Sequence, residues 1–166
     1  MEITLRKARS SDSEIILAWR NEPSTIPWMG NKRALSSDEH QAWFTKMLDD
    51  PDCLFFIIEI SGNPVGQLRY HRNDTSFENT ARVSLNLTEK MHGKGIATRA
   101  FKKGSELVKE LDFAKIIVGY PLPTNLASIK ALEKAGYVRE KMVAMHNTTH
   151  LIMLHHLSGD NNASVE

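Results

Sequence analysis

The chain has 166 residues, of which 41% are hydrophobic and 25% charged, a composition typical of a globular protein with one domain. Lysines and arginines number 21 and acidic residues 20, so the near-neutral charge argues against a nucleic-acid or membrane-surface partner. The only cysteine, Cys53, excludes an internal disulfide and favours a cytoplasmic location. Neither a signal peptide nor a membrane-spanning run of apolar residues is evident.

Apolar periodicity and turn residues predict alternating strands and helices along the chain. The first half should contain a strand at 3–8, a helix from 11 or 12 to 21, a loop or broken helix at 22–35, a helix from 36 or 37 to 49, a strand at 54–60, a turn at 61–64, a strand at 65–71 and a polar turn at 72–79. The second half should contain a strand at 81–87, a helix at 95–111, a strand at 115–118, a helix at 125–135, and a hairpin of 137–145 with 150–157. This order predicts a mixed α/β fold with a single domain at 1–157 and a polar, disordered tail at 158–166.

The most informative stretch runs from Ala81 to Phe101. Its first part alternates like a half-buried strand, and its last part has the period of an amphipathic helix whose apolar face ends at Leu111. Gly93 and Gly95 lie between the two. A helix that begins here presents free N–H groups and the positive end of its dipole, and glycines allow a ligand to approach closely. The junction therefore predicts an anion site, most naturally for a pyrophosphate, with an ordinary strand-to-helix turn as the alternative.

The junction lacks the Gly-x-x-x-x-Gly-Lys-Ser/Thr and Gly-x-Gly-x-x-Gly patterns, which excludes the commoner nucleotide loops. Residues 92–97, His-Gly-Lys-Gly-Ile-Ala, instead resemble the acetyl-CoA loop of the GNAT superfamily of N-acetyltransferases, with His92 in place of the usual Arg or Gln. Residues 125–128, Asn-Leu-Ala-Ser, and 132–137, Leu-Glu-Lys-Ala-Gly-Tyr, resemble the second cofactor segment of that family. The two motifs have the order and spacing of the family.

The resemblance covers nearly the whole chain and implies the GNAT fold, a mostly antiparallel sheet of about seven strands flanked by about four helices. In that fold the motif strand and the next strand splay apart, and main-chain groups bind the pantetheine arm of acetyl-CoA between them. Acetyl-CoA is then the acetyl donor. No metal is implied, and the histidines near the end of the chain are interpreted as surface residues. The implied cofactor-binding residues are Leu85, Asn86, Leu87, His92, Gly93, Lys94, Gly95, Ile96, Ala97, Asn125 and Ser128.

The N-terminal half carries Trp-Arg-Asn at 19–21 and Glu-His at 39–40. This pattern resembles acetyltransferases of bacterial amino-sugar pathways, in particular the group that acetylates the 4-amino group of a UDP-linked sugar on the way to pseudaminic acid. The resemblance implies a small amine substrate, most naturally a sugar nucleotide, and leaves a homodimer open. Arg20, Asn21, His40 and Arg69 are the expected substrate-binding residues, because they carry donors for phosphate or hydroxyl groups. Helix capping, core packing and simple surface exposure are their alternative roles.

The reaction requires an amine that attacks the thioester, a donor for the oxyanion, and an acid for the departing thiolate. A backbone N–H of the motif strand can serve the oxyanion. In many GNAT enzymes a tyrosine is the acid, and that position is Leu132 here, so the resemblance assigns no catalytic residue. The candidates near strand ends are Tyr70, His71, Glu78 and Tyr120.

Other functions stay open from the sequence. Ribosomal-protein acetyltransferases share parts of the N-terminal pattern, so a protein N-terminus is an alternative acceptor. A polyamine is another, although a polyamine site should be rich in carboxylates. The missing tyrosine also keeps open a non-catalytic acyl-CoA-binding module.

Overall fold

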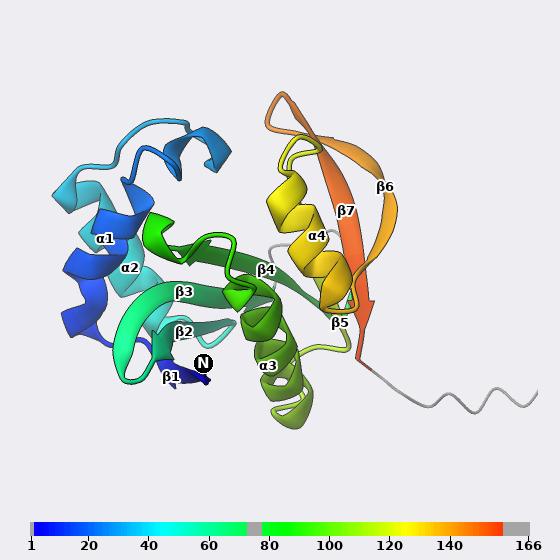
Figure 1. The fold of residues 1–166 in the computed structure, drawn as a ribbon, viewed down its shortest axis with the longest axis horizontal. Coiled ribbons are helices and arrows are strands. Elements are labelled where there is room, and N and C mark those ends of the chain that lie inside the picture. The colour runs from blue at the N-terminus through cyan, green and yellow to red at the C-terminus, as the bar shows by residue number, and fades with distance from the viewer. Residues whose placement is uncertain (1, 73–77, 158–166) are drawn as a thin grey trace, which may run out of the picture.

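The computed structural model describes residues 2–72 and 78–157, and within them seven strands form one sheet in the order β1-β2-β3-β4-β5-β7-β6 (Figure 1). The strands are β1 (Ile3–Lys7), β2 (Cys53–Ile60), β3 (Asn63–Arg72), β4 (Thr80–Leu87), β5 (Ile116–Gly119), β6 (Val138–Met145) and β7 (Thr148–His156). Neighbours pair antiparallel except β4 and β5, which pair in parallel. The predicted mixed α/β fold is confirmed, and the expected tail at 158–166 lies outside the described residues.

The helices of the described chain are α1 (Ser13–Arg20), α2 (Ser37–Asp49), α3 (Ile96–Glu110) and α4 (Leu126–Lys134), with short 3-10 turns η1 (Ser10–Asp12), η2 (Ile26–Trp28) and η3 (Glu89–Met91). The predicted start of α2 is confirmed, because Ser36 and Glu39 form a reciprocal capping box. Asp12, one of the two predicted caps of α1, is its N-cap residue. Its side chain makes no capping hydrogen bond, because the carboxylate accepts two hydrogen bonds of 2.8 Å from the Arg6 guanidinium.

The helices cover the sheet in two layers, with α1 and α2 on one face and α3 and α4 on the other (Figure 1). Successive side chains of β3 point to opposite faces of the sheet, and Leu68 and Tyr70 pack into the core shared with α3 and α4. On the other face, Trp19 of α1 and Phe44 of α2 pack against Phe55 of β2. Trp19 is 5% exposed, which agrees with a core role.

Most boundaries differ from the sequence prediction by one or two residues, and two of the differences concern α3 and the β2–β3 turn. The apolar face of α3 does not extend to Leu111, which is 57% exposed, because the helix ends at Glu110. The turn between β2 and β3 is shorter than expected, since Asn63 already pairs with Ile60. Neither difference moves the glycine-rich loop.

The predicted splay between β4 and β5 is present. The two strands pair over three residue pairs, the last of which joins Arg82 to Val118. On its other side β4 stays paired with β3 as far as Leu87. β5 ends at Gly119, and its opposite edge pairs with β7 from Ile116 to Gly119. The second half of β4 therefore presents an edge that no strand of the described chain covers.

Candidate functional site

Two glycines shape the loop between η3 and α3. Gly93 has a φ of 71° and Gly95 a φ of 73°, a left-handed backbone that glycine adopts without strain. Gly95 is the N-cap of α3, and no side chain caps this helix. A Cβ added to either glycine would meet no heavy atom within 4 Å, so the surface in front of both is open. Free N–H groups behind an open surface fit a pyrophosphate held at a helix N-terminus.

Positive charge surrounds this N-terminus. Lys94 is exposed between the two glycines, and the Arg99 guanidinium folds back to 3.4 Å from the Lys94 carbonyl and 3.5 Å from the Gly95 carbonyl. His92 has a different role, because its Nε2–H donates to the Leu87 carbonyl at 3.0 Å. His92 therefore braces the loop against the end of β4, while Lys94 and Arg99 supply charge for a phosphate.

The residues expected at the pantetheine lie on the open edge of β4. Leu85 packs against the core of the α3 face. Asn86 points to the opposite face, where its Oδ1 accepts a hydrogen bond of 3.3 Å from the Thr25 hydroxyl. Asn86 is 7% exposed and Leu87 6%, so both side chains are buried. Binding of the pantetheine through the main chain of this edge stays a prediction.

The second motif forms the start of α4. Asn125 is its N-cap, and the Asn125 Oδ1 accepts the Ser128 N–H at 3.3 Å. Leu132, at the family position of the tyrosine, is 2% exposed. Its Cδ1 lies 3.3 Å from where a Cβ of Gly119 would be, so Leu132 fills the core side of the splay. Ile96 of the first motif is also buried at 1% exposure, which leaves only its backbone for a ligand.

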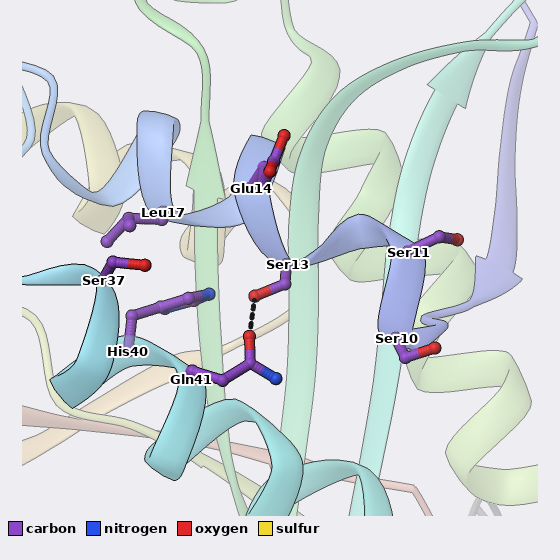
Figure 2. Close-up of a pocket in the computed structure, with 8 residues that line it drawn as sticks. All are labelled: Ser10, Ser11, Ser13, Glu14, Leu17, Ser37, His40 and Gln41. Atoms are coloured by element: carbon purple, nitrogen blue, oxygen red, sulfur yellow. Dashed lines mark hydrogen bonds between the residues drawn. The ribbon is translucent and has the colours of Figure 1, made fainter.

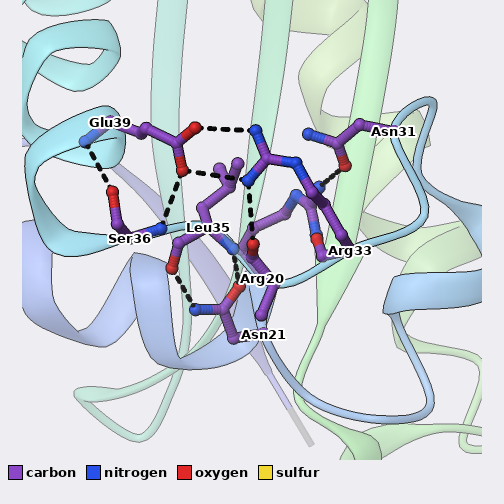
Figure 3. Close-up of polar contacts among 8 residues, drawn as sticks. Arg20, Asn21, Asn31, Arg33, Leu35, Ser36 and Glu39 are labelled. Carbon is purple, nitrogen blue, oxygen red and sulfur yellow. Dashed lines mark hydrogen bonds and ion pairs between the residues drawn. The ribbon is translucent and has the colours of Figure 1, made fainter.

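Asn21 lies at the end of α1 and holds the segment that precedes α2 (Figure 3). Its Nδ2 donates to the Leu35 carbonyl at 2.9 Å, and its Oδ1 accepts the Leu35 N–H at 2.8 Å. The amide is thus used to brace the loop. The expected contact of Asn21 with substrate stays a prediction.

Arg20 belongs to the same network but has only neutral partners. It donates to Asn31 Oδ1 at 2.5 Å and to the Arg33 carbonyl at 3.3 Å (Figure 3). The Glu39 carboxylate, drawn in the same network in Figure 3, pairs with the Arg33 guanidinium at 2.6 Å, which lowers the pKa of Glu39 to about 2. Burial and the charge of Arg33 lower the pKa of Arg20. Within the described residues no carboxylate forms an ion pair with Arg20, so its charge is uncompensated.

His40 is in a different place from Arg20. It is 2% exposed, and its ring stacks on Phe44 with centroids 5.5 Å apart. A pocket of about 300 Å³ opens between α1 and α2 beside it (Figure 2). The other residues that line the pocket are Ser10, Ser11, Ser13, Glu14, Leu17, Ser37 and Gln41. None of the other expected substrate residues lines it.

Arg69 lies against aromatic side chains of α2 and β2. Its guanidinium carbon lies 4.8 Å from the centroid of the Trp43 ring and 5.9 Å from that of Phe55. The charge therefore stacks on the aromatic cluster of α2 and β2. Arg20 and Asn21 therefore belong to the network that precedes α2, whereas His40 and Arg69 both lie beside the Trp43 ring. Their convergence on one substrate pocket stays a prediction. Helix spacing and strand alternation predict on which face of a helix or strand a side chain lies. They do not predict which helices and strands contact one another.

The family model for the acetyltransferase (GNAT) domain matches residues 2–138. The chain belongs to the GNAT acetyltransferases. Aminoglycoside N(6')-acetyltransferase type 1 of Klebsiella pneumoniae is 23% identical over 155 residues, which are 85% of this chain and 76% of that protein. A structure of AAC(6')-Ib with ribostamycin and coenzyme A has a TM-score of 0.86 at 20% identity and covers 99% of this chain and 100% of its own. A spermidine N-acetyltransferase chimera from Vibrio cholerae and hSSAT has a TM-score of 0.81 at 18% identity, over 95% and 97% of the chains.

This GNAT acetyltransferase uses acetyl-CoA as the acetyl donor. Among the described residues no group of three or more His, Cys, Asp or Glu could hold a metal ion. No helix in the described ranges has the length and apolarity needed to cross a bilayer. Burial raises the pKa of the Cys53 thiol to about 11, which makes a nucleophilic role for it untenable at neutral pH.

The three tyrosines of the acetyltransferase differ in position. Tyr70 is completely buried and Tyr137 is 2% exposed, both on the α3 face, and burial raises the pKa of both. Tyr120 is only half-buried and directly follows β5 at the splay, with its ring centroid 5.1 Å from the Arg82 guanidinium carbon. Its carbonyl accepts the His150 Nδ1–H at 2.9 Å, which fixes its backbone. Of the candidate phenols, Tyr120 is the one beside the open edge of β4.

The other two candidates lie away from the glycine-rich loop. His71 forms an ion pair of 2.8 Å with Asp50 and pairs across the sheet with Arg82, the residue that Tyr120 also contacts. Glu78 is exposed in the turn that precedes Thr80, the first residue of β4. Neither is next to the glycine-rich loop. These placements do not assign the acceptor of the amine proton.

Two further residues near the loop and the end of β4, Arg99 and Glu22, were not predicted from the sequence. Arg99 stands four residues after Gly95, so the i to i+4 spacing of a helix that starts there could have indicated it. Glu22 accepts hydrogen bonds from Thr88 and Glu89 at the far end of β4. In the sequence Glu22 is notable only as a charged residue next to Pro23. This does not indicate which part of the chain its carboxylate contacts.

We expect the acetyltransferase to lose stability as the pH falls below about 6.5, the ordinary pKa of histidine. Burial lowers the pKa of His40, and burial and His156 lower that of His155. His155 was expected on the surface, but its Nδ1 lies 3.3 Å from the Ser105 hydroxyl inside the protein. Because both folded-state pKa values are depressed, the unfolded chain binds protons more readily, and acid favours unfolding.

Urea denaturation at pH 7.5 and pH 5.5 measures this effect. His155→Gln should flatten the pH dependence, whereas His146→Gln, at an exposed turn residue, should leave it as in the wild type. If the free energy of unfolding changed equally between the two pH values in the wild type and in both variants, the assignment of the effect to His155 would be contradicted.

Proposed function

We propose that the acceptor of this acetyltransferase is an amino sugar that carries an anionic group, most simply a nucleotide-linked amino sugar. The relatives are named for aminoglycosides, which are amino sugars with several positive charges. The proposed acceptor is also an amino sugar, but it carries negative charge. The supporting feature is the uncompensated charge of Arg20 at the end of α1.

Arg20 at the end of α1 and Lys32 and Arg33 before α2 carry three positive charges, and Glu39 of α2 pairs with only one of them, Arg33. The one carboxylate within 21–36, Glu22, has both oxygens engaged with Thr88 and Glu89 at 2.8 Å. A phosphate from a substrate would supply the missing counter-charge for a guanidinium that is partly removed from water. An aminoglycoside or spermidine carries several ammonium groups, and this segment offers no unengaged carboxylate to receive them.

The location of this segment relative to the cofactor loop supports an acceptor role. Glu22 follows Arg20 by two residues and contacts Thr88, the residue after the end of β4. In Figure 1 the segment between α1 and α2 lies on one side of the end of β4, and α4 with the β6–β7 hairpin lies on the other. A substrate bound by Arg20 would therefore be near the open edge of β4, where the thioester of the donor is expected.

The chemistry needs little from the side chains. The free amine attacks the carbonyl carbon of the acetyl group, and a main-chain N–H on the open edge of β4 donates to the oxygen that becomes negative. When the carbon–sulfur bond breaks, the Tyr120 phenol gives its proton to the thiolate and regains one from solvent. The amine loses its own proton to water. Acetyl-CoA binding is assigned to Gly93, Lys94, Gly95 and the helix N-terminus behind them.

Steady-state kinetics of the purified enzyme with a UDP-linked 4-amino sugar, an aminoglycoside and spermidine tests the proposal. The UDP-linked sugar should give the highest kcat/KM. Arg20→Ala should lower that kcat/KM by about tenfold to a hundredfold, the value of a charged hydrogen bond, while acetyl-CoA affinity stays unchanged. Arg20→Gln keeps a donor for Asn31 but removes the charge. It should lower kcat/KM for the UDP-linked sugar nearly as much as Arg20→Ala does.

Arg139→Ala is the matched control, since this arginine pairs with the exposed Glu133 far from the segment. It should behave like the wild type. A preference of the wild type for the polycations, or an Arg20→Ala enzyme with unchanged kinetics, would rule out an anionic acceptor. The cytoplasmic location, the single domain at 1–157 and the homodimer stay predictions.

A further inference from the structure

The segment between α1 and α2 is fastened to the far end of β4 by one carboxylate. The Glu22 Oε1 accepts the Thr88 hydroxyl at 2.8 Å, and the Glu22 Oε2 accepts the Glu89 N–H at 2.8 Å. The partners are 66 and 67 residues away in sequence. A weaker contact of 3.3 Å from Thr25 to Asn86 supports the same junction. Hydrogen bonds to a carboxylate are the stronger kind, so Glu22 makes the principal link.

On one side, the link continues into the glycine-rich loop. Thr88 and Glu89 begin the η3 turn, in which the Met91 N–H donates to the Thr88 carbonyl and the His92 N–H donates to the Glu89 carbonyl. The His92 ring then returns to the Leu87 carbonyl at 3.0 Å. A single short turn therefore joins the Glu22 carboxylate to Gly93, the first glycine of the loop.

On the other side, the link continues into the network of Arg20. The N–H groups of Thr25 and Ile26 donate to the Glu22 carbonyl at 2.9 Å and 3.1 Å. Directly before Glu22, Asn21 holds the Leu35 backbone through two hydrogen bonds. The position of Glu22 thus sets the position of both ends of the segment at 22–36.

We propose that Glu22 is a positioning residue that couples the two halves of the site, so that coenzyme A bound at the glycine-rich loop orders the segment at 22–36. Binding at the loop holds η3 in one position, and η3 presents its Thr88 hydroxyl and Glu89 N–H to Glu22. The effect is reciprocal by linkage, so an ordered segment also favours donor binding. The inference depends on donor binding at the loop and holds whatever amine the enzyme acetylates.

Amide hydrogen exchange with saturating coenzyme A as the probe tests the coupling. In the wild type, coenzyme A should slow exchange in peptides from 88–100 and also, by about tenfold, in peptides from 22–36. In Glu22→Ala the slowing at 88–100 should remain, and the slowing at 22–36 should fall below about twofold, because both hydrogen bonds are lost and even one charged hydrogen bond accounts for about a factor of ten. Thr88→Val, which removes one of the two donors and keeps the side-chain shape, should reduce the slowing at 22–36 as well.

Glu14→Ala is the control, because Glu14 is an exposed carboxylate at the other end of α1, and it should match the wild type. Thermal unfolding of each variant shows whether it is folded. Slowing at 22–36 that is the same in Glu22→Ala and in the wild type would overturn the coupling. So would a wild type in which coenzyme A protects only 88–100.

Discussion

Gly95→Glu is expected to weaken acetyl-CoA binding by at least about a hundredfold while the protein stays folded. Two effects act together. The new carboxylate stands at the N-terminus of α3, in the open space where we place the pyrophosphate, and it repels the phosphates and neutralises the dipole. The φ of 73° also disfavours any side chain, by about 1–2 kcal/mol. Isothermal titration calorimetry with acetyl-CoA measures the affinity directly.

Gly62→Glu is a close control for the backbone effect. Gly62 has a φ of 76° in the turn between β2 and β3, and a Cβ there would likewise meet no atom within 4 Å. It should show the same strain in thermal unfolding and bind acetyl-CoA as the wild type does. A folded Gly95→Glu enzyme with wild-type affinity would refute the assignment of the donor to this loop.

Tyr120→Phe is expected to lower kcat by about a hundredfold, a typical contribution of a general acid, with acetyl-CoA affinity unchanged. Without the phenol, the thiolate must take its proton from water. The ring itself is kept, so the contact with the Arg82 guanidinium at 5.1 Å is retained and the fold should not change. Single-turnover kinetics separates the chemical step from product release.

Tyr70→Phe is the matched control for the hydroxyl. The Tyr70 side chain is completely buried, and a Cβ on Gly104 of α3 would collide with its oxygen. Its removal should affect stability and leave kcat within about twofold of the wild type. If Tyr70→Phe lowered kcat and Tyr120→Phe did not, the acid would have been placed on the wrong face of the sheet.

The two tyrosines show how far sequence alone goes in choosing a catalytic group. Both stand near strand ends, and the sequence offered them as equal candidates. Alternation along β3 directs Tyr70 to the α3 face, where Leu68 also packs. Tyr120 lies beyond the last residue of β5, at a position that becomes open only because β4 and β5 separate after Arg82 and Val118. That separation is a property of the assembled sheet.

Local chemistry determined much of this protein from its sequence. The capping box of Ser36 and Glu39 defines the start of α2, and alternation defines the strands. The loop of Gly93 and Gly95 also follows from residues that are neighbours in the chain, because left-handed backbone and a free helix N-terminus are local properties. For the same reason the family resemblance, which depends on these short segments, led to the correct fold.

The tertiary structure alone decided which distant side chains meet. The sequence offered Arg20, His40 and Arg69 only as residues with suitable donors, and packing decides that His40 and Arg69 both lie beside Trp43 while Arg20 contacts Asn31. Glu22 reaches Thr88 across 66 residues, and no spacing rule connects the two. Such contacts depend on how the helices lie on the sheet, which is set by the burial of both apolar cores together. Periodicity states which face of an element is buried, and only the folded chain states what that face meets.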